Sequence, residues 1–475
     1  MMTIVEALAR LERGEITAVE LTQQALARID EVDDKVAAVL TRLDDRALAA
    51  AAASDEKRKN GEALGRLEGI PFTAKDMFLV DGVRTTAASK MLDNFIAPFT
   101  ATAIKKLEAE GAILIATVNQ DEYAHGGSTE YSAYGPSKNP RDIGRVPGGS
   151  SGGSAAALAA GIGLFSVGTD TGGSIRQPAA YCGVVGVKPT YGLISRFGVV
   201  AMASSLDVIG PFAHTAEDAA LLTDIMAGQD EMDATTIKSE KVVSDVVSPK
   251  RVGVVREYIQ TLDADVRVRY DEVFAQLTKA GWELEEVSLP NLEFALPCYY
   301  VLTPSEISSN LERYDGIRYG SSTESAGDLE AMYSATRGKF FGPEVKRRIL
   351  TGTYALSAGY YDAYYKKAMQ LRTLVCQDFE RAFSEFDILI GPTTPTEAFK
   401  FGEHSADPTE MYLADIMTVA ANLAGIPAIS LPIVGVSDMP LGLQIMAPQK
   451  GEAAMFGAAR DAENILQVQL AEVKL

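Results

Sequence analysis

Cysteine, histidine and tryptophan are scarce in this chain of 475 residues, which contains three, three and one of them. The cysteines Cys182, Cys298 and Cys376 form no CxxC pair, and such an odd, scattered set excludes a disulfide framework and is typical of a reducing compartment. No HExxH motif occurs, which excludes the commonest zinc pattern. Glu122 and His125 have the i, i+3 spacing of carboxylate-bridged metal bundles, but a second such pair is missing. We therefore expect no metal site.

Long apolar runs and a basic surplus are missing too. No run approaches the length of a membrane span, and the first 15 residues lack the apolar centre of a signal peptide. Acidic residues outnumber basic ones by 64 to 44, for a net charge of −20. This charge argues against a chain that binds nucleic acid by itself, and the basic cluster Lys346–Arg348 does not reverse that conclusion. We expect a cytoplasmic protein without membrane contact.

The common nucleotide-binding motifs are also absent. Neither GxxxxGK[ST] nor GxGxxG occurs. If ATP takes part in the overall reaction, this chain does not bind its phosphates through a P-loop. We expect no cofactor in the chain itself.

Segments with helical and strand patterns alternate along most of the chain, which predicts an α/β fold. Thr17 and Glu20 are spaced as a capping box at the start of a helix. The sequence predicts these helices and strands: helices at 4–11, 18–29, 45–59, 102–110, 155–160, 265–280 and 412–423; strands at 69–76, 112–116, 164–167, 251–255, 282–287, 386–391, 428–431 and 441–446. No linker divides the chain, so we predict a single domain. It would comprise an N-terminal helical segment (1–60), a catalytic core (61–225), an inserted strand–helix–strand and helical portion (226–385) and a C-terminal part of the core (386–475).

Two serine clusters flanked by glycine, GGSSGGS (148–154) and DTGGS (170–174), carry most of the chemical information. Glycines beside a serine let the backbone approach a reacting carbonyl and turn several N–H groups toward one point. This is how a protein builds a nucleophile with an oxyanion hole. A flexible linker is the alternative, but the helix-like and strand-like segments between the clusters speak against it.

A serine nucleophile needs a base, and Lys75 is the notable candidate. It ends the apolar strand IPFTAK, where burial would favour the neutral amine. Pairing with Asp76 at the strand end is an equally good interpretation from the residues alone. A serine–histidine–carboxylate triad stays open, although no GxSxG elbow is present. Cys182 is a conceivable nucleophile, but YCGVVG is more typical of a small buried residue on a strand.

These motifs resemble the amidase signature family. The glycine- and serine-rich core matches from residue 145 to 178, and the likeness continues through 186–222. Three later segments, at 315–320, 344–368 and 415–432, narrow the resemblance to the glutamine-hydrolysing subunits of tRNA-dependent amidotransferases. The resemblance implies a large mixed, twisted β-sheet covered by helices on both faces.

By this resemblance Ser174 is the nucleophile, Ser150 the bridging serine and Lys75 the base, while Ser151 is a structural neighbour. The oxyanion hole would consist of the backbone N–H groups of Thr171, Gly172, Gly173 and Ser174.

The resemblance also implies a pocket that holds the α-carboxylate of glutamine on Arg348 and its α-ammonium on Asp415. Arg347 is a rival for the first role, and both arginines could instead lie on a solvated helix face. Tyr299 and Ser128 match lesser contacts.

Three positions depart from the family pattern: His125 replaces a usual methionine, Met77 replaces the asparagine that usually follows AKD, and Val208 replaces the glutamine of SSLDQIGP. Of these, His125 bears on glutamine affinity.

The implied activity is hydrolysis of glutamine to glutamate and ammonia by a Ser–Ser–Lys relay. A partner B subunit would use the ammonia, with ATP and Mg²⁺, to convert Glu-tRNA(Gln) to Gln-tRNA(Gln), and a small C subunit would complete a heterotrimer. Two alternatives stay open: a stand-alone amidase acting on small amides, and a catalytically silent scaffold.

Overall fold

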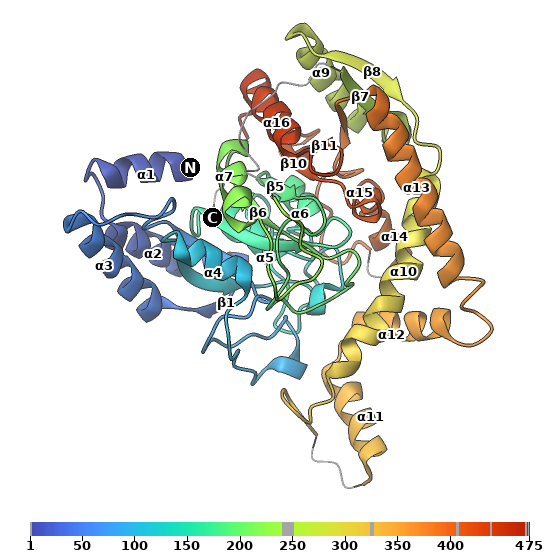
Figure 1. Ribbon diagram of the computed structural model, residues 1–475, viewed down its shortest axis with the longest axis horizontal. Helices are drawn as coiled ribbons and strands as arrows, with labels where there is room; N and C mark the ends of the chain where they lie inside the picture. The colour runs from blue at the N-terminus through green and yellow to red at the C-terminus, as the bar shows by residue number, and fades with distance from the viewer. Residues whose placement is uncertain are drawn as a thin grey trace.

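The computed structural model describes residues 2–239, 251–323, 327–404, 408–437, 439–470, 473 and 475. Part of the 229–250 segment, which the sequence marks as a polar excursion, therefore lies outside the described residues. Figure 1 shows a central body with a helical arm, α10–α13, along one side. Within the described ranges, no helix is long and apolar enough to cross a membrane.

One mixed sheet holds the strands together in the order β1-β3-β2-β4-β6-β5-β10-β11-β9-β7-β8. The strands are β1 Val39–Arg42, β2 Pro71–Lys75, β3 Ile113–Val118, β4 Phe165–Asp170, β5 Val185–Lys188, β6 Val208–Ala213, β7 Arg251–Val255, β8 Glu283–Val287, β9 Ile388–Pro392, β10 Ala428–Val434 and β11 Pro440–Met446. The strands β3, β2 and β4 run parallel, as do β9, β7 and β8, and the remaining neighbours pair antiparallel.

The central strands are covered on both faces. Successive side chains of a strand point to opposite faces of the sheet. Every residue of β2, β3, β4, β6, β9 and β11 is buried, so both faces must carry other elements. This confirms the predicted fold class, a mixed sheet between helices.

The helices follow largely from their amphipathic patterns and caps. They are α1 Ile4–Glu12, α2 Ala18–Val36, α3 Asp44–Lys59, α4 Thr102–Ala109, α5 Gly152–Ala159, α6 Arg176–Cys182, α7 Ala216–Met226, α8 Arg256–Gln260, α9 Ala264–Lys279, α10 Ala295–Asn310, α11 Leu329–Phe340, α12 Pro343–Leu356, α13 Tyr365–Glu385, α14 Pro408–Leu413, α15 Val419–Ala424 and α16 Glu452–Leu466. The capping box predicted at Thr17 and Glu20 is present, with hydrogen bonds in both directions. Helix α2 continues seven residues beyond its predicted end at residue 29.

Two predictions for local structure are wrong. The predicted helix 412–423 is two short helices, α14 and α15, with a turn between them. In that turn the Thr418 hydroxyl lies within hydrogen-bonding distance of two carbonyl oxygens, those of Asp415 and Gly172. Cys182 does not lie on a strand but ends α6, where its thiol donates to the Pro147 carbonyl.

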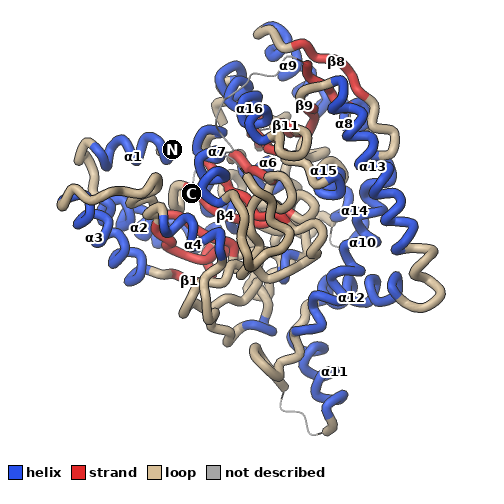
Figure 2. The backbone as a smooth tube through the Cα atoms, viewed as in Figure 1, coloured by secondary structure: helices blue, strands red, loops and turns tan. Residues whose placement is uncertain are grey.

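Lys75 and the DTGGS loop leave the sheet side by side. The parallel neighbours β2 and β4 end at Lys75 and Asp170, and ligands of α/β sheets bind beyond such carboxyl ends. Figure 2 shows long loops, coloured tan, gathered over the middle of the molecule. The sheet thus brings the two candidate motifs to one place.

Candidate active site

The Lys75 amine lies at the centre of a ring of three hydroxyl groups. Its Nζ is 2.7 Å from Ser150 Oγ, 2.9 Å from Thr169 Oγ1 and 3.0 Å from Ser151 Oγ. The lysine and both serines are fully buried. The structure therefore brings together two of the three residues expected to carry the chemistry.

Burial lowers the pKa of Lys75 to about 7, although three buried carboxyl groups oppose the shift, those of Asp121, Asp207 and Asp170. A lysine with this pKa is partly neutral at pH 7 and can accept a proton.

Asp76 is not the partner of Lys75, so that alternative is wrong. Its carboxylate instead accepts hydrogen bonds from Thr86 and from the Thr117 hydroxyl. Burial raises the pKa of Asp76 to about 6. Thr86 and Thr117 satisfy this carboxylate, which leaves the Lys75 amine facing neutral hydroxyl groups.

The two serines beside Lys75 differ in what their hydroxyl groups can do. Ser151 Oγ donates to the Thr169 carbonyl at 3.0 Å while it accepts from Lys75. Ser150 Oγ has Lys75 as its only hydrogen-bond partner within the described chain. Ser150 is thus free to exchange a further proton, whereas the proton of Ser151 is already engaged.

Glycine is required at position 149, directly before Ser150, to which it is joined by a cis peptide bond. A Cβ atom at Gly149 would overlap an Asp121 carboxylate oxygen and would lie 2.7 Å from the Ser128 amide nitrogen. No side chain fits there. This close approach also places Ser128, itself buried, beside the Ser150 loop.

Ser174 presents a free hydroxyl next to this loop. Its backbone carbonyl accepts a hydrogen bond from the Ser151 amide at 3.2 Å. Within the described chain its hydroxyl forms no hydrogen bond, including none with Ser150, and the residue is 9% exposed. The two loops are therefore in contact through their backbones, with the Ser174 Oγ available to an incoming group.

The DTGGS loop is held by an ion pair that sequence reasoning missed. Arg176 lies against Asp170 with Nη2–Oδ1 and Nε–Oδ2 distances of 2.9 and 3.0 Å, and both side chains are fully buried. Burial alone would raise the pKa of Asp170, but the Arg176 charge holds it at about 2. The remaining three guanidinium hydrogens are accepted by the Thr418 carbonyl and by the side-chain oxygens of Asn422 and Gln444. Asp170 and Arg176 are the first and last residues of the sequence DTGGSIR. Two opposite charges at the ends of a glycine-rich loop were therefore the sequence signal that could have predicted this ion pair.

One of the four predicted oxyanion donors, the Gly173 amide, is wrong, because Asp170 of this ion pair accepts its N–H. The Gly173 amide donates to Asp170 Oδ1 at 2.9 Å, so this N–H points away from a substrate. The amides of Thr171, Gly172 and Ser174 form no hydrogen bond within the described residues. Three of the four predicted donors therefore remain unengaged.

Arg348 and Asp415 are far apart in the sequence, but both contact the aromatic residue Tyr300. Arg348 on α12 is anchored through Nε to Glu344 at 2.8 Å, and its guanidinium lies 5.4 and 5.5 Å from the ring centres of Tyr300 and Tyr412. Asp415 accepts a hydrogen bond from Tyr300 at 3.1 Å. The two charged side chains form no ion pair with each other among the described residues, and the Arg348 Nη groups have no hydrogen-bond acceptor there.

Both charges suit a ligand that carries a carboxylate and an ammonium. Burial raises the pKa of Asp415 to about 7, against the influence of the Arg348 charge. Arg347, the rival predicted for the same role, points outward and pairs with Glu344. The burial of Arg348 contradicts the alternative of a solvated helix face for this residue.

Tyr299 joins this pocket to the serine loops. A Cβ atom at Gly172 would lie 2.6 Å from the Tyr299 ring, so this glycine allows the ring to pack on the DTGGS loop. The neighbouring Tyr300 binds Asp415, and the Thr418 hydroxyl donates to the Gly172 carbonyl at 2.5 Å. Tyr300, Tyr412 and Thr418 were not predicted, because only the folded chain brings α10 and the turn after α14 together.

His125 is buried and neutral. Burial lowers its pKa to about 3, and the Arg348 charge contributes to the shift in the same direction. Its Nδ1 contacts the Glu122 carbonyl at 3.1 Å, while Nε2 has no partner in the described chain. Glu122 is instead engaged by Ser89 and the Gly342 amide, and no group of three metal-ligating side chains occurs in the ranges described.

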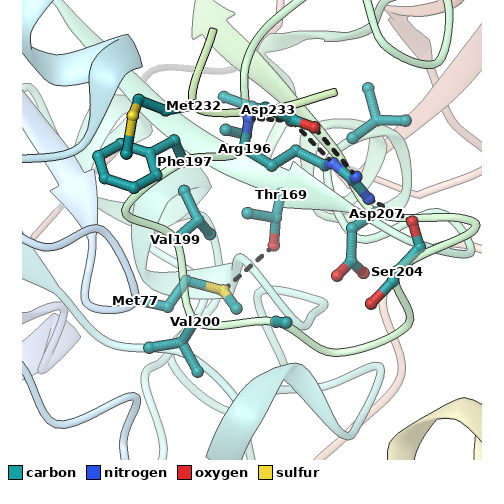
Figure 3. Close-up of a pocket in the computed structure, with 13 residues that line it drawn as sticks. Met77, Thr169, Arg196, Phe197, Val199, Val200, Ser204, Asp207, Met232 and Asp233 are labelled. Atoms are coloured by element: carbon teal, nitrogen blue, oxygen red, sulfur yellow. Dashed lines mark hydrogen bonds and ion pairs between the residues drawn. The ribbon is translucent and has the colours of Figure 1, made fainter. Parts of the chain in front are cut away.

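A cavity of about 190 Å³ is lined in part by Thr169 (Figure 3). The Thr169 hydroxyl, which contacts Lys75, is 3.3 Å from the Met77 sulfur, and both residues line this cavity. Arg196 and Asp233 form an ion pair across from them. Thr169 thus contacts the Lys75 amine and also lines this cavity.

Comparisons with known proteins show the family of this chain. The family model "Amidase" matches residues 20–456, and the chain therefore belongs to the amidase family. Within that family it is similar to the A subunit of glutamyl-tRNA(Gln) amidotransferase from Thioalkalivibrio sulfidiphilus, with 51% identity over 470 residues that span 98% of this chain and 97% of the relative. Its counterpart from Koribacter versatilis is 50% identical over 473 residues, 98% of each chain.

Solved structures show the same likeness. The crystal structure of the glutamyl-tRNA(Gln) amidotransferase A subunit from Thermotoga maritima covers the whole of this chain with a TM-score of 0.82 and 39% identity, over 98% of its own length. The peptide amidase of Stenotrophomonas maltophilia covers 99% of this chain with a TM-score of 0.83 and 28% identity, over 98% of its own length. The predicted family and its fold are both confirmed.

Proposed function

We propose that this chain is the glutamine-hydrolysing subunit of a glutamyl-tRNA(Gln) amidotransferase and acts in the cytoplasm. The observation that carries the proposal is the buried Lys75 amine, 2.7 Å from Ser150 and with a pKa lowered to about 7. Similarity to the amidotransferase A subunits over nearly the whole chain supports the substrate and the setting.

In the first half of the reaction neutral Lys75 draws a proton from Ser150, which takes one from Ser174. Rotation of the Ser174 side chain, whose hydroxyl has no partner in the described chain, brings its Oγ toward Ser150. Ser174 then attacks the side-chain amide carbon of glutamine. The amides of Thr171, Gly172 and Ser174 stabilise the tetrahedral oxyanion, each donor contributing about 3 kcal/mol.

In the second half the proton returns along the relay to the leaving nitrogen, and ammonia departs. Water, deprotonated by the same relay, hydrolyses the γ-glutamyl ester on Ser174 and releases glutamate. Arg348 and Asp415 hold the α-carboxylate and α-ammonium throughout, so that the amide carbon stays in line with Ser174. Tyr299 and Ser128 border the bound glutamine.

The ammonia would pass to a partner B subunit that consumes ATP and Mg²⁺ to amidate glutamate on misacylated tRNA(Gln), with a C subunit completing the heterotrimer. This chain would then need no cofactor of its own, and tRNA contact would fall mainly to the B subunit.

Substitution of the nucleophile tests the chemistry directly. We expect Ser174→Ala to lower glutaminase kcat by more than about 10⁴-fold, because no neighbouring group replaces the hydroxyl. A fluorophosphonate probe should label the wild-type serine and leave the variant unlabelled, whereas Ser154→Ala, a buried serine outside the relay, should still be labelled. Retention of activity in Ser174→Ala would refute the proposed nucleophile.

A stand-alone amidase is the second candidate, favoured by the TM-score of 0.83 with a peptide amidase. Purification of the tagged chain from its native cells separates the two. Co-purified subunits that raise its glutaminase rate support the amidotransferase. Full activity toward small amides in an isolated chain supports the amidase.

A further inference from the structure

The arm α10–α13 carries an exposed apolar face at its outer end. We call the tyrosine face the set Leu350, Tyr354, Tyr360, Tyr361 and Tyr364, whose side chains are 42–70% exposed. It spans the end of α12, the connection that follows and the start of α13, which project from the side of the molecule in Figure 1.

The tyrosines are ordered against one another before anything covers them. The Tyr354 ring lies 4.4 Å from the Tyr360 ring and 5.9 Å from the Tyr364 ring, and Tyr361 stacks on Tyr365 at 5.3 Å. Large apolar groups gathered on a surface mark interaction sites. Tyrosine is also among the residues that contribute most to protein interfaces, because its large ring loses little entropy on binding.

The charge around the face is opposite to that of the whole molecule. Residues 343–374 contain six basic and two acidic residues, in a chain of net charge −20. One acid, Glu344, and one base, Arg348, are buried. Arg347, Lys366 and Lys367 are exposed at the rim, where Arg347 pairs with Glu344 and Lys366 with the exposed Asp362, so the exposed charge stays basic overall. A partner that fits this surface has an apolar centre with carboxylates around it.

Helix α12 links this face to the candidate active site. Its inner side carries Arg348 and Glu344, while Arg347, Leu350 and Tyr354 lie on its outer side. The Glu344 carboxylate binds both Arg348 inside and Arg347 outside. A partner seated on the outer side of α12 would therefore fix the helix that positions the substrate-binding arginine.

An open hollow of about 650 Å³ borders the same face. Tyr361, Tyr365 and Leu356 line it from the arm. On the other side it is lined by Arg196 and Ser204, which also line the cavity beside Thr169 and Lys75. A partner on the tyrosine face would therefore lie beside a hollow that shares lining residues with the cavity at Thr169.

We propose that the tyrosine face is the surface on which a partner protein of the complex docks, one whose apolar contact patch is rimmed by carboxylates, and that docking there raises glutamine hydrolysis by fixing α12. The inference rests on the proposed function, because it assigns a surface to the partner that function requires.

The test compares Leu350→Glu/Tyr361→Glu with Val268→Glu, a control at an exposed apolar position on α9. Each is co-expressed with the subunits that co-purify with the wild-type chain. We expect the double variant to weaken assembly about thirtyfold or more and to lose the partner-dependent increase in glutaminase rate. Its basal rate and melting temperature should match the wild type, and the control should assemble normally. In wild type, hydrogen exchange of residues 346–366 should slow on assembly.

The outcomes distinguish failure of the proposed docking surface from failure of the proposed function. Normal assembly of the double variant, or unchanged exchange at 346–366, overturns the docking surface and leaves the proposed function intact. A wild-type chain that binds no partner overturns both. Two further results would overturn the proposal. One is self-association of the chain through the tyrosine face, seen in light scattering and abolished by the double variant. The other is binding of RNA, in place of a protein, to this face.

Discussion

In the proposed relay, Lys75 makes glutamine hydrolysis sensitive to pH near neutrality. Its pKa is lowered to about 7, so the neutral amine that accepts a proton predominates above this pH and disappears below it. We expect kcat for glutamine to rise as the pH increases through about 7 and then to level off. Lys75→Arg, which stays charged, should be inactive at every pH. A kcat that is flat from about pH 5.5 to 8.5 would contradict the role of Lys75.

Substitution of Arg348 tests its proposed role in substrate binding separately from the chemical step. A lysine at this position keeps the charge but loses the planar fork that binds a carboxylate through two hydrogen bonds. We expect Arg348→Lys to raise KM for glutamine about 10- to 100-fold and to change kcat by less than about fivefold. Arg347→Lys, on the outer side of the same helix, serves as the control. An equal rise in KM for both variants would show that α12, not the fork, was affected.

Residues with a chemical signature could be predicted from the sequence, and their supporting groups could not. Glycine-flanked serines and a lysine that ends an apolar strand mark the two serine clusters and Lys75 as candidates, and the family resemblance selects Ser150 and Ser174 within the clusters. Whether Gly173 turns its amide to a substrate depends on Asp170, whose carboxylate takes that N–H. Asp170 is held in turn by Arg176, so the geometry emerges only in the folded loop.

At the scale of elements, the Asp170–Arg176 pair joins β4 and α6 to the C-terminal part of the chain. Arg176 also binds Asn422 on α15 and Gln444 on β11. We expect Arg176→Met to lower the free energy of unfolding by about 3–5 kcal/mol, because it leaves the Asp170 charge buried without its partner. Arg256→Met, which breaks an exposed pair with Glu286, should change stability little. Urea denaturation measures both, and equal small losses would disprove this anchoring role.

Elements whose signals are local were predicted well. The capping box of α2 and the apolar strands β2 and β3 depend on neighbouring residues, and their predicted positions agree with the structure. The helix predicted at 412–423 fails because its middle bonds to another segment. Thr418 donates to the Gly172 carbonyl, which lies 246 residues earlier in the chain. The periodic pattern of apolar residues in 412–423 gives no information about a contact with a distant segment, so it could not predict the break in the helix.

The whole molecule has one large net charge, and this predicts weak binding of RNA by the isolated chain. With a net charge of −20, the chain repels a polyanion at long range. We expect fluorescence anisotropy with labelled tRNA to show no binding up to about 10 µM protein at about 150 mM salt. The assembled complex should bind under the same conditions. Micromolar binding by the isolated chain would place tRNA contact on this chain itself.

The fold class could be predicted at this scale because alternating elements and family motifs both point to a sheet between helices. The strand order could not. Strand β5 pairs with β10, which begins at Ala428, far later in the chain, and no pattern in either strand records the other.

This strand order sets a sequence of events during synthesis. Lys75, Ser150 and Ser174 leave the ribosome long before Arg348 and Asp415. The residues proposed for the relay are thus synthesised before those proposed to hold glutamine, and before Asn422 and Gln444, which bind Arg176 and so hold the DTGGS loop. The edge of β5 that pairs with β10 is exposed until β10 is made, so the first half of the chain can pair with another chain at this edge.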